Sequence, residues 1–219
     1  MLYLAFVHGD GVLRSRYMES FVRFCQKVQY VSDPSVPLVL KSCPDYRNFL
    51  FIKSKIPNAK FVFLFRHPLR LLDSQLRIFQ KGEANKLMLM MSKRYSITES
   101  PVVKRLMKGA FSDCFGINPG HSWLIHRMKV AEGQLFKDLP FVERKDYIFV
   151  GYEELMVDAQ SHVQRILAHV GETCPADVNL NPYTQPRKFE LLPDIQKRQE
   201  YLLRLFQKTR DLVGFDEEV

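Results

Sequence analysis

The segment that most constrains the fold is a run of five apolar residues, Phe61 to Phe65, followed at once by Arg66-His67-Pro68. A continuous apolar run of this length is typical of a strand that is covered on both faces, as in the middle of a parallel sheet. Pro68 suits the first turn of a helix, because its missing N–H would have no partner there. The segment therefore predicts a buried strand that passes directly into a helix.

The end of this expected strand carries a candidate anion-binding pair. Arg66 follows the apolar run, and Ser74 lies eight residues later on the expected helix. Open parallel sheets bind ligands at the carboxyl ends of their strands. A guanidinium can hold two phosphate oxygens at once, and a hydroxyl adds a neutral donor. The alternative from spacing alone is that Arg66 closes a salt bridge at the sheet edge and that Ser74 faces solvent.

The rest of the chain alternates between strand-like and helix-like patterns. Apolar residues at helical spacing predict helices over 16–30, 45–55, 69–80, 121–134 and 194–212. Asp158, as N-cap, and Gly171, as C-terminal stop, delimit another helix. Strands are expected over 38–40 and from Tyr147, while residues 2–7 fit a strand or the end of a helix. The 38–40 and 61–65 strands and the helix between them predict a β-α-β unit with a right-handed crossover. The pattern predicts an α/β fold in which the last helix packs back on the sheet.

Composition favours one compact domain and an anionic partner. The 219 residues include 46% hydrophobic side chains, which is enough for a single core. The net charge of +8 favours a nucleotide, an acidic glycan, nucleic acid or a membrane surface as partner. The basic residues are scattered, which argues against a nucleic-acid-binding tail. The four cysteines form no C-x-x-C pair, so neither a zinc site nor a redox motif is predicted. No apolar run reaches the length of about eighteen residues that predicts a membrane span.

Three segments, in the right order, resemble the sulfotransferases that use 3′-phosphoadenosine 5′-phosphosulfate (PAPS). The sequence PNAKFVFLFRHP, followed by Ser74, is similar to the segment that holds the 3′-phosphate, with His67 in place of the usual aspartate. Upstream, PLVLKS resembles the strand that ends near the transferred sulfuryl group. Downstream, YIFVGYEEL resembles the strand and turn whose tyrosine, here Tyr152, lies against the adenine. The resemblance covers roughly residues 35 to 215.

The resemblance implies a fold and an activity. The implied fold is a three-layer α/β sandwich with a central, mostly parallel sheet, similar to P-loop NTPases, and residues 1–219 would form one such domain. The implied activity is transfer of a sulfuryl group from PAPS to a hydroxyl or amine, with carbohydrate among the candidate acceptors and 3′-phosphoadenosine 5′-phosphate (PAP) as product. Neither a metal nor a nucleic-acid partner is implied.

The resemblance also assigns roles to residues at the reaction centre. Lys41 would stabilise the sulfuryl oxygens or the leaving phosphate, and Ser42 would assist by hydrogen bonding. The family commonly has a histidine base shortly after that lysine, and Asp45 is the stand-in here. The alternatives are a solvated lysine at position 41 and a helix N-cap at position 45. Arg187-Lys188 is similar in place to a late Arg-Lys-Gly loop over the 3′-phosphate, although the glycine is missing.

The amino end departs from the family. Residues 8–16, HGDGVLRSR, lack the G-T-T or G-S-T that normally follows the first strand and cradles the 5′-phosphosulfate. One expectation is therefore a truncated or catalytically impaired member that binds only a nucleotide or a partner. A nucleotide kinase or a basic nucleic-acid-binding domain is the third alternative. The chain as written is expected to be cytoplasmic, or in the Golgi lumen if its amino terminus is incomplete, and the acceptor, the base and the oligomeric state stay open.

Overall fold

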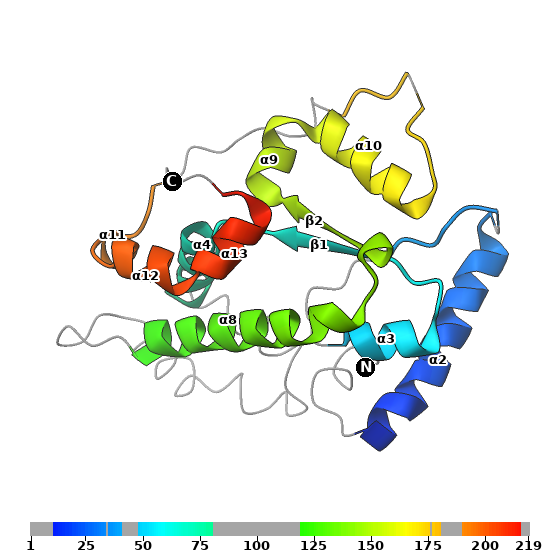
Figure 1. Ribbon diagram of the computed structural model, residues 1–219, viewed down its shortest axis with the longest axis horizontal. Helices are drawn as coiled ribbons and strands as arrows, with labels where there is room; N and C mark the ends of the chain where they lie inside the picture. Colours follow the sequence, from blue (N-terminus) through cyan, green and yellow to red (C-terminus); the bar gives the residue numbers. More distant parts are fainter. Residues whose placement is uncertain are drawn as a thin grey trace.

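The computed structural model describes residues 11–33, 35–40, 48–80, 119–175, 177–180 and 190–215, which form a helix-rich α/β protein (Figure 1). In chain order the elements are α2 (Gly11–Val31), α3 (Phe49–Lys55), β1 (Phe61–Phe65), α4 (Pro68–Gln80), α8 (Pro119–Asp138), η2 (Leu139–Phe141), η3 (Arg144–Asp146), β2 (Tyr147–Gly151), α9 (Tyr152–Val157), α10 (Ala159–Val170), α11 (Pro193–Gln196), α12 (Gln199–Leu205) and α13 (Gln207–Val213). The strand or helix end expected over 2–7 lies outside the described residues.

The two strands form a parallel sheet, as the apolar run predicts. They pair in register from Phe61 with Tyr147 to Phe65 with Gly151. The aromatic face of this sheet packs on α3 and α8, where Phe49 and Leu135 are buried. The rings of Phe49 and Phe63 meet edge to face, with their centroids 5.3 Å apart. Aromatic packing thus fixes the sheet on these two helices.

The opposite face of the sheet is covered unevenly. Val150 of β2 is fully buried, and β2 contacts α9, α10 and α13. Val62 and Leu64 of β1 are 38% and 53% exposed. The prediction that the first strand is covered on both faces is therefore wrong for the described residues, because the helices on this side lie against β2 (Figure 1).

The strand predicted over 38–40 is not formed. Residues 37–40 have no regular structure, and Val39 is 77% exposed. Three apolar residues are fewer than the five or six of an ordinary strand, so few ladder hydrogen bonds would hold them. The predicted β-α-β unit therefore lacks its first strand within the described part of the chain, and α3 leads into β1 alone.

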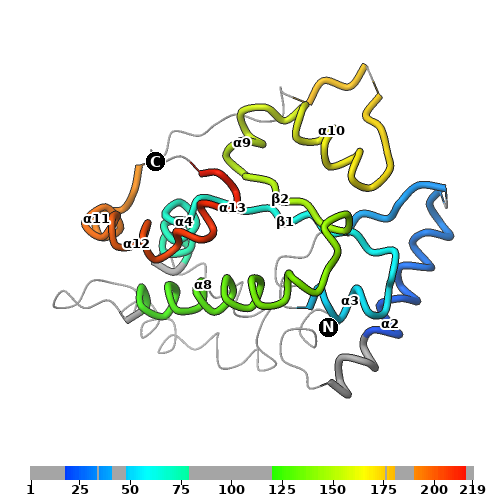
Figure 2. Tube along the Cα trace, in the orientation of Figure 1, coloured from blue at the N-terminus to red at the C-terminus, as the bar shows by residue number. Residues whose placement is uncertain are grey.

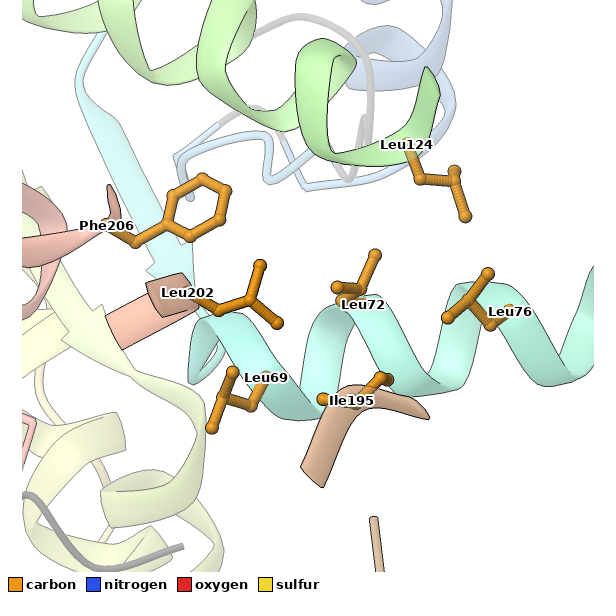
Figure 3. Packing of buried hydrophobic residues seen from close by; sticks show 7 residues of the cluster. All are labelled: Leu69, Leu72, Leu76, Leu124, Ile195, Leu202 and Phe206. Atoms are coloured by element: carbon orange, nitrogen blue, oxygen red, sulfur yellow. The ribbon is translucent and has the colours of Figure 1, made fainter. Parts of the chain in front are cut away.

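A second core surrounds α4, the helix that follows β1. Its apolar face is buried against α8 and the last helices; the cluster consists of Leu69, Leu72, Leu76, Leu124, Ile195, Leu202 and Phe206 (Figure 3). The carboxyl-terminal region is three short helices, α11 to α13, where the sequence predicts one. These helices pack mainly on α4, and α13 reaches β2, so the predicted packing on the sheet is correct only for α13.

The ends of α10 agree with the sequence. The Asp158 carboxylate accepts a hydrogen bond from the backbone N–H of Ser161 at 3.1 Å. Gly171 ends the helix in the left-handed region at a φ of 92°. The other predicted helices correspond to α2, α3, α4 and α8 with shifted ends. Among the helices that the structure describes, none combines the length and the apolar character that crossing a membrane requires.

Candidate functional site

The parallel register brings two predicted site residues together. Phe65 pairs with Gly151, so the next residues, Arg66 and Tyr152, leave the sheet side by side. Figure 2 shows the chain turning from β1 into α4 and from β2 into α9 at this same edge. The guanidinium carbon of Arg66 lies over the Tyr152 ring, 5.2 Å from its centroid. A cation and an aromatic ring therefore share the carboxyl edge of the sheet.

Glu153 of α9 contacts the two residues that follow β1, Arg66 and His67, and so connects the ends of the two strands. One of its carboxylate oxygens, Oε2, accepts a hydrogen bond from the backbone N–H of His67 at 3.0 Å. The other, Oε1, lies 3.9 Å from Nε of Arg66. The salt bridge considered for Arg66 as an alternative is thus present. It leaves the arginine side chain 33% exposed, so the ion pair and a ligand-binding role are compatible.

Ser74 is placed on the helix that begins directly after this edge. It is half-buried on α4, and Arg70 precedes it by one turn on the same side of the helix. The Ser74 hydroxyl has no hydrogen bond to another described residue, Arg66 included, so it is an available donor. Ser74 therefore lies on the expected helix, α4, but no hydrogen bond connects it to Arg66.

His67 is buried under the same edge as a neutral ring. Its imidazole packs edge-on against Phe215 with the centroids 5.6 Å apart. Neither ring nitrogen has a hydrogen-bond partner in the part of the chain that the structure covers. Burial, and then the positive charges of Arg210 and Arg70, lower the pKa of His67 to about 4. The ring therefore adds no charge beside Arg66 at neutral pH.

Arg210 of α13 is a buried cation that the sequence does not reveal. Its side chain is 5% exposed, and its NH1 group donates to Oε1 of Gln207 at 3.1 Å. Within the described ranges, no carboxylate pairs with it, and its Nε has no hydrogen-bond partner. A buried guanidinium raises the positive potential nearby. Among the described residues, the carboxyl edge of the sheet is thus electropositive, with Glu153 as the acid in contact with Arg66.

An electropositive edge with an adjacent aromatic ring can bind a phosphorylated ligand that carries an aromatic base. The described residues contain no group of three or more histidine, cysteine or acidic side chains that could hold a metal ion. Five predicted site residues lie outside the described part: Lys41, Ser42, Asp45, Arg187 and Lys188. The described part of the chain therefore holds only the portion of the expected site that Arg66, Ser74 and Tyr152 would form.

Comparison with known proteins identifies the family to which the chain belongs. A family model for the sulfotransferase family matches residues 7–176, which is more than half of the chain. The chain belongs to the sulfotransferase family. No curated protein and no solved structure was found to match it.

Glu153 and Arg210 are the site residues that sequence reasoning missed. Glu153 follows Tyr152 within the YEEL segment, so its place beside the strand end was a usable signal. Arg210 lies within a helical pattern of mixed polar and apolar residues, and only the packing of α13 brings it to the edge. The first could be found from the motif, and the second needs the three-dimensional structure.

Proposed function

We propose that this protein binds PAPS and transfers its sulfuryl group to a hydroxyl or amine acceptor. Membership of the sulfotransferase family supports the reaction class. The observation that carries the proposal is the placement of Arg66 against Tyr152 at the carboxyl edge of two parallel strands. In this proposal Tyr152 lies against the adenine, while Arg66 and Ser74 donate to the 3′-phosphate.

The roles at the reacting end rest on the family pattern. Sulfuryl transfer needs an acceptor in line, stabilisation of charge on the sulfuryl and bridging oxygens, and a group that accepts the acceptor's proton. Lys41 and Ser42 are proposed to stabilise those oxygens, and Asp45 to accept the proton. Arg187 and Lys188 are proposed to cover the 3′-phosphate. Bound PAPS would supply the activated sulfuryl group, and PAP would leave.

The same family pattern supports a three-layer sandwich as the complete fold of one domain over residues 1–219. Consistent with it, α3 and α8 lie on one face of the parallel sheet, and α9 and α10 lie on the side of β2 away from them (Figure 1). A P-loop-like topology would place further parallel strands beside β1. The helices that connect such strands pack on the faces of the sheet and would cover the exposed Val62 and Leu64.

A catalytically impaired member that only binds nucleotide is the second candidate. It is favoured by the amino end, where residues 8–16 lack the usual phosphate-cradling sequence and α2 already begins at Gly11. Both candidates share the nucleotide edge and differ only in whether transfer occurs.

Calorimetric titration with PAP tests the shared step. The protein is expected to bind PAP more tightly than adenosine 5′-phosphate (AMP), which lacks the 3′-phosphate. Arg66→Ala is expected to weaken PAP binding about 30-fold, because losing charge-assisted hydrogen bonds costs about 2 kcal/mol. The matched control is Lys145→Ala, which removes one exposed positive charge just before β2, at the opposite end of the sheet.

Equal affinity for PAP and AMP would contradict nucleotide binding through Arg66. Transfer of labelled sulfate from PAPS to a panel of carbohydrate, phenol and amine acceptors then separates the two candidates. Product formation that is lost in Lys41→Ala supports the transferase. PAP binding without transfer to any acceptor supports the impaired member.

A further inference from the structure

Glu153 uses both of its carboxylate oxygens at the junction between the strands. Oε2 accepts from the backbone N–H of His67, and Oε1 faces Nε of Arg66 at 3.9 Å. Both Oε1 and that Nε are buried and have no hydrogen-bond partner among the described residues, so the contact between them is an ion pair without a hydrogen bond. The guanidinium of Arg66 is also held over the ring of Tyr152. Its inner nitrogen therefore faces Glu153, while the terminal nitrogens have no hydrogen-bond partner among the described residues and the side chain is partly exposed.

We propose that Glu153 is a positioning residue that orients Arg66 for the 3′-phosphate of the nucleotide, an inference that rests on the function proposed above. A guanidinium grips phosphate best when two of its N–H groups point the same way. Holding Nε from behind directs the two terminal nitrogens away from the carboxylate and toward the open edge. Ordering the side chain in advance removes part of the entropy that binding would otherwise cost.

A purely structural role for Glu153 would require only the hydrogen bond to His67. The backbone N–H of His67 is satisfied by a single oxygen, and an amide could accept that bond equally well. The second oxygen, Oε1, is not needed for that bond and faces Arg66 instead. The neighbouring Glu154 shows the contrast, because its carboxylate lies against the backbone of Gly151 and 3.9 Å from His162.

Electrostatics alone predicts the opposite outcome for loss of the Glu153 charge. A carboxylate near an anion-binding site repels the ligand, so neutralising it would by itself strengthen phosphate binding. Orientation of Arg66 predicts weaker binding, because the amide of Glu153→Gln presents either an N–H or a weaker acceptor to Nε. The direction of the change therefore separates the two effects.

The experiment compares PAP and AMP as probes in calorimetry with Glu153→Gln, Arg66→Ala and the double variant. Glu153→Gln is expected to lower the affinity for PAP about five-fold, the cost of ordering one long side chain, and to leave the affinity for AMP unchanged. In the Arg66→Ala background the same change is expected to have no further effect. Glu154→Gln is the matched control, with the same change one residue along the chain and no loss expected.

The outcomes separate this inference from the function on which it rests. If the unaltered protein does not prefer PAP over AMP, nucleotide binding through Arg66 fails, and this inference fails with it. If the preference exists but Glu153→Gln keeps or increases it, only the positioning role is overturned. Equal losses for PAP and AMP, or a loss that persists without Arg66, mean that Glu153 serves the fold alone.

A second variant covers the case in which Glu153→Gln does not fold. Glu153→Asp keeps the charge and shortens the side chain by one methylene, so that one carboxylate cannot reach both of its partners. The same selective loss for PAP is expected. An unchanged ratio of PAP to AMP affinity in Glu153→Asp would overturn the positioning role.

Discussion

His67 determines how the stability of this protein should depend on pH. The pKa of its buried ring is about 4 in the folded protein, against an ordinary value of 6.5. Burial is the main cause, and the guanidinium groups of Arg210 and Arg70 add to it. Well above pH 6.5 the ring is neutral in both the folded and the unfolded chain, so it does not lower the free energy of unfolding. Below pH 4 it must be charged in both, and the folded state bears the whole penalty.

The size of this penalty follows from the two pKa values. At about 1.4 kcal/mol for each pKa unit, the full difference corresponds to about 3 kcal/mol. About 2 kcal/mol of this decrease in the free energy of unfolding falls between pH 7 and pH 5, a pH range in which denaturation can be measured. Stability therefore declines as the pH falls through this window, which is the direction expected of a histidine buried in its neutral form.

Urea denaturation of the unaltered protein and of His67→Phe measures the effect. Phenylalanine keeps a ring against Phe215 and cannot be protonated, and the native ring nitrogens have no partner to lose in the described structure. Between pH 7 and pH 5, the free energy of unfolding of the native protein is expected to fall by about 2 kcal/mol more than that of His67→Phe. His126→Gln, which removes a histidine from an exposed position of α8, is the control variant. A gap between His67→Phe and the native protein that stays constant with pH would refute the reasoning.

Two further predictions concern stability and are checked by the same denaturation measurements at pH 7. Asp73→Asn is expected to lower the free energy of unfolding by about 2 kcal/mol. The buried carboxylate accepts from Nε of Arg77 at 2.6 Å and from the N–H of Leu192 at 2.7 Å, and an amide has one acceptor oxygen for these two donors. An unchanged value would show that the second of these bonds carries no net stability. Gly133→Ala, in the middle of α8 where a methyl group meets no neighbour, is expected to raise the free energy of unfolding by about 0.5 to 1 kcal/mol. Gly171→Ala, at a φ of 92°, is expected to lower it by about 1 kcal/mol. Two changes of the same sign would contradict this contrast.

Local patterns predict the elements that carry Arg66 and Tyr152. The 61–65 strand, the helix after Pro68 and the helix between Asp158 and Gly171 all follow from short-range rules on apolar runs and caps, and the structure has them. The meeting of Arg66 and Tyr152 was also predictable, because parallel strands end at one edge of a sheet. The family and a helix-rich α/β fold with parallel strands are thus accessible from the sequence.

Long-range packing decides what the sequence left out or predicted wrongly. Arg210 reaches the site only because α13 folds back beside β2, and no local pattern encodes that distance along the chain. The strand expected over 38–40 depends on a neighbour to complete its ladder, and the exposure of Val62 depends on which helices cover β1. The three-way division of the last helix is likewise invisible in its apolar spacing.

The burial of α4 has a consequence for biosynthesis. The helix that carries Ser74 buries its leucines against Ile195, Leu202 and Phe206 (Figure 3). Its Asp73 accepts a hydrogen bond from the backbone N–H of Leu192, 119 positions away in the sequence. A nascent chain that stops short of these residues leaves that leucine surface in water and open to aggregation or chaperones. The apolar face of α4 should therefore be covered only after residues 192 to 206 have been synthesised.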